Sequence, residues 1–216
     1  MITHGHATSS RSDEQAHIVA SDWQTGVMIP GSPPTKGRLL VATPPLEDAN
    51  FDRTVIFMLE HHDEGAVGVV INRPSIEALD EPLDRWIDLQ SAPSSVFLGG
   101  PVEDTALIAL AETVNPLDVD DEYLSPITAT IASADLTADP ALVAAGVRGV
   151  RVFRGYAGWG PGQLEGEIDA GAWLVLDSEP GDIFSNDPDE LWRTVIRRQP
   201  GRLAWLADVP DDLSSN

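Results

Sequence analysis

The amino-acid sequence predicts an α+β fold built on a mixed β-sheet. The first three predicted strands, within residues 37–72, follow one another with no helix between them. Farther along, helical and strand patterns are interspersed without the regular alternation that is typical of a doubly wound parallel sheet. Because no internal repeat or interior linker interrupts the pattern, we expect a single domain over residues 35–207.

The earliest predicted elements are a strand and a β-hairpin. The strand covers Gly37–Thr43 and ends at two prolines. In the hairpin, Arg53–His61 is rich in β-branched and aromatic residues, and Ala66–Asn72 is rich in valine and isoleucine. The segment His62–Gly65 joins them with residues that are typical of a turn.

The later elements follow from apolar periodicity and from breaker residues. Apolar residues at helical spacing predict a helix from about Glu81 to Leu89, with Pro82 in its first turn. Another helix is predicted at Ser133–Ala145, with Asp139-Pro140 as an N-terminus inside it. The remaining predicted elements are strands at Val96–Leu98, Leu107–Ala111 and Val147–Phe153, a helix at Pro161–Asp169, a strand at Ala172–Asp177 and a helix at Asp187–Arg198.

The composition is that of a globular protein with two polar ends. Of the 216 residues, 42% are hydrophobic and 22% are charged, which is close to average globular usage. Residues 1–34 have little apolar periodicity and end in the breaker cluster Gly31-Ser-Pro-Pro34, so we expect a disordered or loosely attached tail. Residues 208–216 form an acidic C-terminal segment, called here the acidic exit. No apolar run approaches the ~18 residues that a membrane-spanning helix needs.

The absence of cysteine and the large negative charge exclude or disfavour several classes of function. The sequence contains no cysteine and no recognisable secretory signal, which excludes thiol chemistry and makes a cytoplasmic location the default expectation. Thirty-five acidic residues against thirteen basic ones give a net charge of −22. Such a charge repels nucleic-acid phosphates and anionic membranes, so neither is an expected partner. A high-salt cytoplasm and the composition of the lineage both stay open as origins of the acid excess.

The most unusual stretch of the sequence is Phe153–Glu165, with glycines at four positions. We interpret Gly155–Gly162 as a loop that feeds the N-terminus of a helix, where free N–H groups can hold an anion. The glycine spacing matches no dinucleotide- or phosphate-binding fingerprint. The competing interpretation is a tight connection whose Trp159 fills the core. Candidate ligand-binding residues in this stretch are Arg154, Gly155, Gly158, Trp159 and Gly160.

Three arginines, Arg148, Arg151 and Arg154, form the densest basic stretch of the chain. Strand alternation places Arg151 and Arg154 on opposite faces, so a regular strand cannot bring both to one site. Arg154 lies nearest the glycines and is therefore the better candidate for a ligand-binding role. Charge balance against Glu165 or Glu167 is the alternative, and it is slightly favoured.

Further candidates stand at predicted strand ends. Asn72 and Arg73 close the second strand of the hairpin, where they can bind an anion, cap loop carbonyls or pair with a carboxylate. Gly99 and Gly100 follow the short strand at Val96–Leu98 and complete the set of candidate ligand-binding residues.

No catalytic constellation is recognisable in the sequence. There is no GxSxG motif, and no folded-region histidine outside the hairpin turn can serve a serine as base. The run His61–Glu64 resembles a metal cluster, but adjacent strand residues point to opposite faces, so we interpret it as a solvated hairpin tip. We therefore expect no catalytic residue, no metal site and no cofactor.

Several segments together resemble the YqgE/AlgH family, an uncharacterised bacterial group also called UPF0301 or DUF179. The resemblance covers about residues 36–206 in order, and the region 115–140 departs most from it. The segments that carry it are Gly37–Leu46, Asn50–Val55, Gly68–Pro74, Phe97–Val102, Phe153–Glu165 and Gly171–Trp173. The resemblance implies an α+β fold in which a strongly bent mixed sheet forms a pseudo-barrel packed with several helices.

The resemblance does not supply an activity, although the family name carries a role in the transcriptional regulation of alginate production that is drawn from one branch. Our leading hypothesis is a non-catalytic cytoplasmic module that binds a small anionic ligand or an unknown protein, with an indirect role in transcriptional regulation. The alternative is an enzyme of unknown class acting on a small anionic substrate, with Asn72, Arg73 and the glycine backbone as anion ligands. A structural or assembly role is the third hypothesis.

Overall fold

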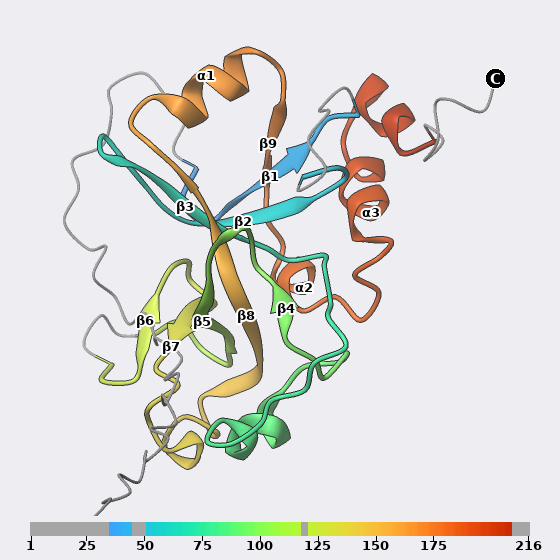
Figure 1. Ribbon diagram of the computed structural model, residues 1–216. Coiled ribbons are helices and arrows are strands. Elements are labelled where there is room, and N and C mark those ends of the chain that lie inside the picture. Colours follow the sequence, from blue (N-terminus) through green and yellow to red (C-terminus); the bar gives the residue numbers. More distant parts are fainter. Residues whose placement is uncertain (1–34, 45–50, 118–120, 209–216) are drawn as a thin grey trace, which may run out of the picture.

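Figure 1 shows the computed structural model of the chain, which describes residues 35–44, 51–117 and 121–208. Within these residues nine strands form one sheet in the order β6-β7-β5-β8-β3-β2-β1-β9, with β4 paired to β8 off this path. The pairing of β4 with β8 is parallel, and the other strand pairings are antiparallel. The strands are β1 (Arg38–Ala42), β2 (Val55–His62), β3 (Gly65–Val70), β4 (Phe97–Leu98), β5 (Val102–Thr113), β6 (Leu124–Pro126), β7 (Ile131–Ala134), β8 (Val147–Trp159) and β9 (Trp173–Asp177).

The long strand β8 belongs to both halves of the sheet. Its first part pairs with β5 and β4, and its last part, Ala157–Trp159, pairs with β3. The sheet therefore bends along β8, with β5, β6 and β7 on one side of the bend and β3, β2, β1 and β9 on the other (Figure 1). The predicted α+β fold, a bent mixed sheet packed with several helices, is confirmed.

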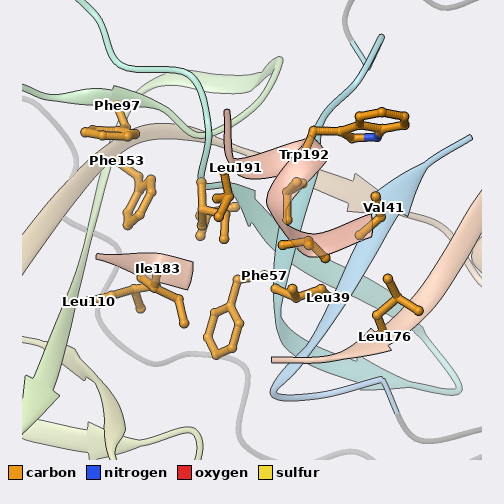
Figure 2. Close-up of a cluster of buried hydrophobic side chains, with 14 of the residues drawn as sticks. Leu39, Val41, Phe57, Phe97, Leu110, Phe153, Leu176, Ile183, Leu191 and Trp192 are labelled. Carbon is orange, nitrogen blue, oxygen red and sulfur yellow. The ribbon is translucent and has the colours of Figure 1, made fainter. Parts of the chain in front are cut away.

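Short helices cover the sheet and close its hydrophobic clusters. Figure 2 shows one cluster, in which Ile183, Leu191 and Trp192 from two helices face Leu39 and Phe57 of the sheet. Complete burial of such a side chain contributes about 1.5–3 kcal/mol. The helical elements are the 3₁₀ helices η1 (Asp84–Leu89), η2 (Pro140–Leu142) and η3 (Gly201–Asp208) and the α-helices α1 (Gln163–Asp169), α2 (Pro180–Ile183) and α3 (Leu191–Arg197).

The predicted loop at Gly155–Gly162 is wrong for most of its length, because β8 continues to Trp159. Gly155 has a φ of +67° and lies where the register between β5 and β8 shifts. Between the pairs Leu107–Arg154 and Val102–Tyr156, β5 has four residues and β8 has only Gly155, and Phe153 and Tyr156 on either side of this irregularity belong to the same core cluster. Closely spaced glycines are typical of loops, but here distant ladder partners keep the chain extended.

The predicted helix at Ser133–Ala145 is also wrong. Its first residues belong to β7, which pairs with β5 and β6, and only the turn η2 within this range is helical. The N-terminus expected at Asp139-Pro140 is nevertheless correct. The Asp139 carboxylate accepts a hydrogen bond from the Ala141 N–H at 3.0 Å and caps the turn.

Most other predicted elements are present with shifted ends. The first strand and the hairpin correspond to β1, β2 and β3, while η1 and α3 are shorter than the helices predicted over them. The expected tail at residues 1–34 and nearly all of the acidic exit at 208–216 lie outside the described residues. In the described part of the chain, no helix is both long enough and apolar enough to cross a membrane.

Candidate functional site

Two of the candidate arginines lie on either side of Leu98 on one face of the sheet. The Leu98 N–H donates to the Arg73 carbonyl at 2.9 Å, and Phe97 forms an antiparallel bridge with Pro74. On its other side, Leu98 pairs in parallel with Arg154 of β8. Side chains of directly opposed residues share one face, so Arg73, Leu98 and Arg154 form a row, called here the arginine row. Adjacent strands are about 4.8 Å apart, which separates the two arginine backbones by about 10 Å.

The opposite face of the arginine row is core. Phe97 and Phe153 are fully buried there and pack edge to face, with their ring centroids 5.9 Å apart. This packing fixes β4 against β8 and thereby decides which side chains of β4 point outward. Leu98 is 42% exposed and the Arg154 side chain is 35% exposed, so both are accessible to a ligand.

A carboxylate already contacts the arginine row. Arg154 Nη2 donates a hydrogen bond to Glu77 Oε1 at 2.8 Å, and Arg154 Nη1 forms an ion pair with Glu77 Oε2, also at 2.8 Å. The backbone of Glu77 is held beside β4, because its carbonyl accepts from the Val96 N–H at 2.8 Å. We expected Arg154 to pair with Glu165 or Glu167. The carboxylates of these two residues bind other side chains instead.

Asn72 holds the turn that precedes β2. Its Nδ2 donates to the Arg53 carbonyl and its Oδ1 accepts from the Val55 N–H, both at 2.9 Å. Arg53 has a φ of +49°, a left-handed conformation that costs a non-glycine residue about 1–2 kcal/mol. Its guanidinium carbon lies 4.8 Å from the centroid of the Trp192 ring. Of the three roles considered for Asn72, the structure shows the capping of a loop carbonyl.

Arg73 reaches the same turn from the arginine row. Its Nη2 donates to the Asp52 carbonyl at 3.3 Å. A guanidinium has five N–H donors in a planar fork, so this bond is compatible with the binding of an anion. Capping of a loop carbonyl is thus observed for Arg73, and anion binding by this residue stays a prediction.

Gly99, Gly100 and Gly155 allow two backbones to cross at close range. A Cβ on Gly99 would lie 2.3 Å from the Gly155 carbonyl oxygen, and one on Gly100 would lie 2.2 Å from the Tyr156 carbonyl carbon. The Gly99 N–H donates to the Arg154 carbonyl at 2.7 Å. Packing therefore explains these glycines, which lie next to the arginine row.

Tyr156 lies beside this crossing and is 8% exposed. Burial, and then the nearby carboxylate of Glu103, raise the pKa of its hydroxyl. The phenol therefore keeps its proton at neutral pH and cannot act there as a base. Glu103 has a φ of +47°, and within residues 35–44, 51–117 and 121–208 it shares a positive φ with only one other non-glycine residue, Arg53.

The remaining candidates, Gly158, Trp159 and Gly160, lie farther along β8 than the arginine row. Trp159 is 7% exposed, and its Nε1 donates to a carboxylate oxygen of Glu167 at 2.9 Å. Gly158 pairs with Val67 of β3. Trp159 is therefore buried, as the competing interpretation expected, although the residues before it form β8 and not a tight connection. Ligand binding by Gly158, Trp159 and Gly160 stays a prediction.

His61 makes a buried contact that the sequence did not reveal. Its Nδ1 lies 2.8 Å from the Thr35 hydroxyl, and its Nε2 lies 2.9 Å from a carboxylate oxygen of Glu165. The His61 side chain is 7% exposed, so the interpretation as a solvated tip is wrong for this residue. No local pattern could have shown the contact, because 104 residues separate His61 from Glu165. In the described ranges, no three histidine, cysteine or acidic side chains gather as metal ligands.

The chain matches a known protein family over most of its length. A family model described as AlgH-like matches residues 39–204. The chain belongs to the AlgH-like family. A UPF0301 protein of Streptomyces avermitilis is 48% identical to this AlgH-like chain over 182 residues, which cover 83% of the chain and 94% of the relative. A UPF0301 protein of Mycobacterium tuberculosis is 43% identical over 183 residues, with 83% of the chain and 90% of the relative covered.

Two solved structures are similar to the AlgH-like domain. The crystal structure of a Corynebacterium diphtheriae protein has a TM-score of 0.78 at 30% identity, and covers 82% of this chain and 93% of its own. The solution structure of AlgH from Pseudomonas aeruginosa has a TM-score of 0.59 at 31% identity, and covers 86% of this chain and 100% of its own. The resemblance seen in the sequence is therefore confirmed, and a function has to be argued from the site.

Proposed function

We propose that this AlgH-like protein is a non-catalytic cytoplasmic binding module whose ligand carries an anionic group beside an apolar group. The observation that carries the proposal is the arginine row, in which Arg73 and Arg154 flank the exposed Leu98. Guanidinium groups bind carboxylate or phosphate oxygens in pairs, and a leucine side chain offers apolar contact to the rest of a ligand. In a chain of net charge −22, two guanidinium groups on one face concentrate positive charge locally, and one of them is already paired with Glu77.

The contact of Glu77 with Arg154 supports the proposal, because it shows a carboxylate bound to the row through both oxygens. Both side chains are partly exposed, and an exposed ion pair contributes only about 0–1 kcal/mol. A ligand that contacts both arginines and Leu98 can therefore displace Glu77. A simple anion such as inorganic phosphate lacks the apolar contact, so we expect it to compete poorly.

The enzyme alternative has no specific contact in its favour. It relied on free backbone N–H groups in the glycine stretch as ligands for an anion. In the structure, Ala157–Trp159 pair with β3, and the Gly160 N–H donates to the Gln163 side chain at 3.1 Å. A role in transcriptional regulation would be indirect and would act through a protein partner, because the negative charge of the chain opposes contact with DNA.

Titration with sodium octanoate and with inorganic phosphate, followed by NMR chemical-shift changes, tests the proposal. We expect octanoate to shift the amide signals of β4 and the adjacent part of β8. Arg73→Ala and Arg154→Ala should each weaken this binding about tenfold or more, the loss expected for one charge-assisted pair. Arg148→Ala is the matched control, because Arg148 lies on the same strand but pairs with Glu112. Equal affinity in all four proteins, or no octanoate binding at all, would refute the proposal.

A further inference from the structure

The outer side of η3 carries an exposed tryptophan between two charged residues. Trp205 is 70% exposed, whereas every other tryptophan that the structure describes is at most 7% exposed. Arg202 and Asp208 are exposed as well, and the residues between these three are half-buried or buried. Residues three apart in a 3₁₀ helix lie one above the other, so the three side chains form a row, called here the tryptophan row. In Figure 1, η3 is formed by the darkest red turns, beside α3.

The inner side of η3 is anchored to the core. Ala207 is 1% exposed and belongs to the same core cluster as Val195 and Ile196 of α3, and Leu206 packs against that cluster. These contacts fix the orientation of η3, and they leave Trp205 pointing away from the core. A tryptophan side chain buries about 150–250 Å² when it is covered, so a partner that covers Trp205 gains a large apolar contact.

The surroundings of Trp205 are basic, although the chain as a whole is acidic. Residues 191–208 contain four arginines and one acidic residue, whereas the whole chain contains 13 basic and 35 acidic residues. In the part of the chain that the structure describes, no carboxylate lies within ion-pair distance of Arg202.

A second arginine is available at the other end of the tryptophan row. Arg197 of α3 reaches the Asp208 carboxylate at 3.8 Å, and the two side chains are 55% and 78% exposed. Such an exposed ion pair contributes only about 0–1 kcal/mol, so Arg197 can exchange Asp208 for a carboxylate of a partner. Trp205 therefore lies between two guanidinium groups that can accept new carboxylates.

We propose that the tryptophan row, together with Arg197, binds an acidic segment of a protein partner in which an apolar side chain stands between carboxylates. The apolar side chain packs on Trp205, and the carboxylates on its two sides pair with Arg202 and Arg197. Tryptophan and arginine are the residues that most often dominate the binding energy of protein interfaces. Single-stranded nucleic acids also stack on tryptophan, but the net charge of −22 opposes their continuous row of phosphates. The surface is built from η3 and α3, so the proposal does not depend on the arginine row of β4 and β8.

Fluorescence anisotropy of a labelled peptide tests this proposal. The probe is fluorescein-labelled Asp-Glu-Asp-Phe-Leu-Asp-Glu, titrated with the full-length protein at low ionic strength, where exposed charges interact most strongly. We expect saturable binding that Trp205→Ala weakens about tenfold, the loss typical of a dominant interface side chain. Arg202→Ala should weaken it up to about fivefold, the loss expected for one exposed ion pair. A peptide with Ser-Ser in place of Phe-Leu should bind the native protein as weakly as the probe binds Trp205→Ala.

The control variants replace side chains of similar exposure elsewhere on the surface. Leu142→Ala in η2 and Arg148→Ala in β8 should bind the probe like the native protein. No saturable binding, or equal losses in the controls, would overturn the proposal. So would three results that identify another occupant. They are tighter binding of a thymidylate octamer that Trp205→Ala abolishes, a dimer that Trp205→Ala dissociates, and a probe affinity that rises when Asp211 and Asp212 of the acidic exit are replaced by asparagine.

Discussion

Replacing Gly155 by alanine should destabilise the protein more than replacing Gly162 by alanine. The two glycines have φ values of +67° and +72°, so each alanine carries a similar left-handed strain of about 1–2 kcal/mol. Their surroundings differ. A Cβ on Gly155 would lie 2.5 Å from the Gly100 carbonyl oxygen and 3.1 Å from that of Val102, whereas one on Gly162 would meet no atom within 4 Å. Only the first substitution therefore adds an overlap with backbone that cannot rotate away.

The extra overlap sets the expected difference between the two variants. Overpacking in a core costs about 1–3 kcal/mol, so Gly155→Ala should lose about 2–5 kcal/mol of unfolding free energy and Gly162→Ala about 1–2 kcal/mol. For a protein of this size, a difference of about 2 kcal/mol corresponds to about 6 °C in melting temperature. Urea unfolding followed by tryptophan fluorescence measures both losses. Equal losses in the two variants would show that the crossing of the Gly99–Val102 segment with β8 is not tight, and would refute the packing explanation for these glycines.

Two further predictions concern the arginine row and the turn beside it. Glu77→Gln should raise the affinity for octanoate up to about fivefold, because it removes a competing carboxylate whose ion pair is worth about 0–1 kcal/mol, and a lower affinity in the same titration would contradict this. Asn72→Ala should lower the unfolding free energy by about 2 kcal/mol, because it leaves the Val55 N–H and the Arg53 carbonyl without their partner. Asn186→Ala, at an exposed position, is its control and should change the urea midpoint little.

Local elements of this fold could be predicted because their partners are close in sequence. The hairpin of β2 and β3 has strands of clear β-propensity joined by a short turn, so the sequence contains both its pattern and its pairing. The capped turn at Asp139 and the helix after Gly162 are local in the same sense, since each depends on residues within one turn of the chain.

Elements that depend on distant partners were mispredicted. Ile131–Ala134 has a weak pattern of its own and is extended because β5 and β6 pair with it on both sides. The glycines of β8 favour a loop by composition, yet β5, β4 and β3 bind this segment along its length. Secondary-structure propensity predicts a segment poorly when its hydrogen bonds come from strands that are distant in the sequence.

The sequence by itself determined the fold class, the hairpin, the family and the residue types of a candidate binding surface. Only the tertiary structure decided which of those residues meet, because the two-residue strand β4 sets the register that brings Arg73 and Arg154 to one face. On the other face of β8, Arg151 is buried. Strand pairing between distant segments has no local signature, so residues that look equivalent in the sequence become a surface site or a buried charge according to their place in the sheet.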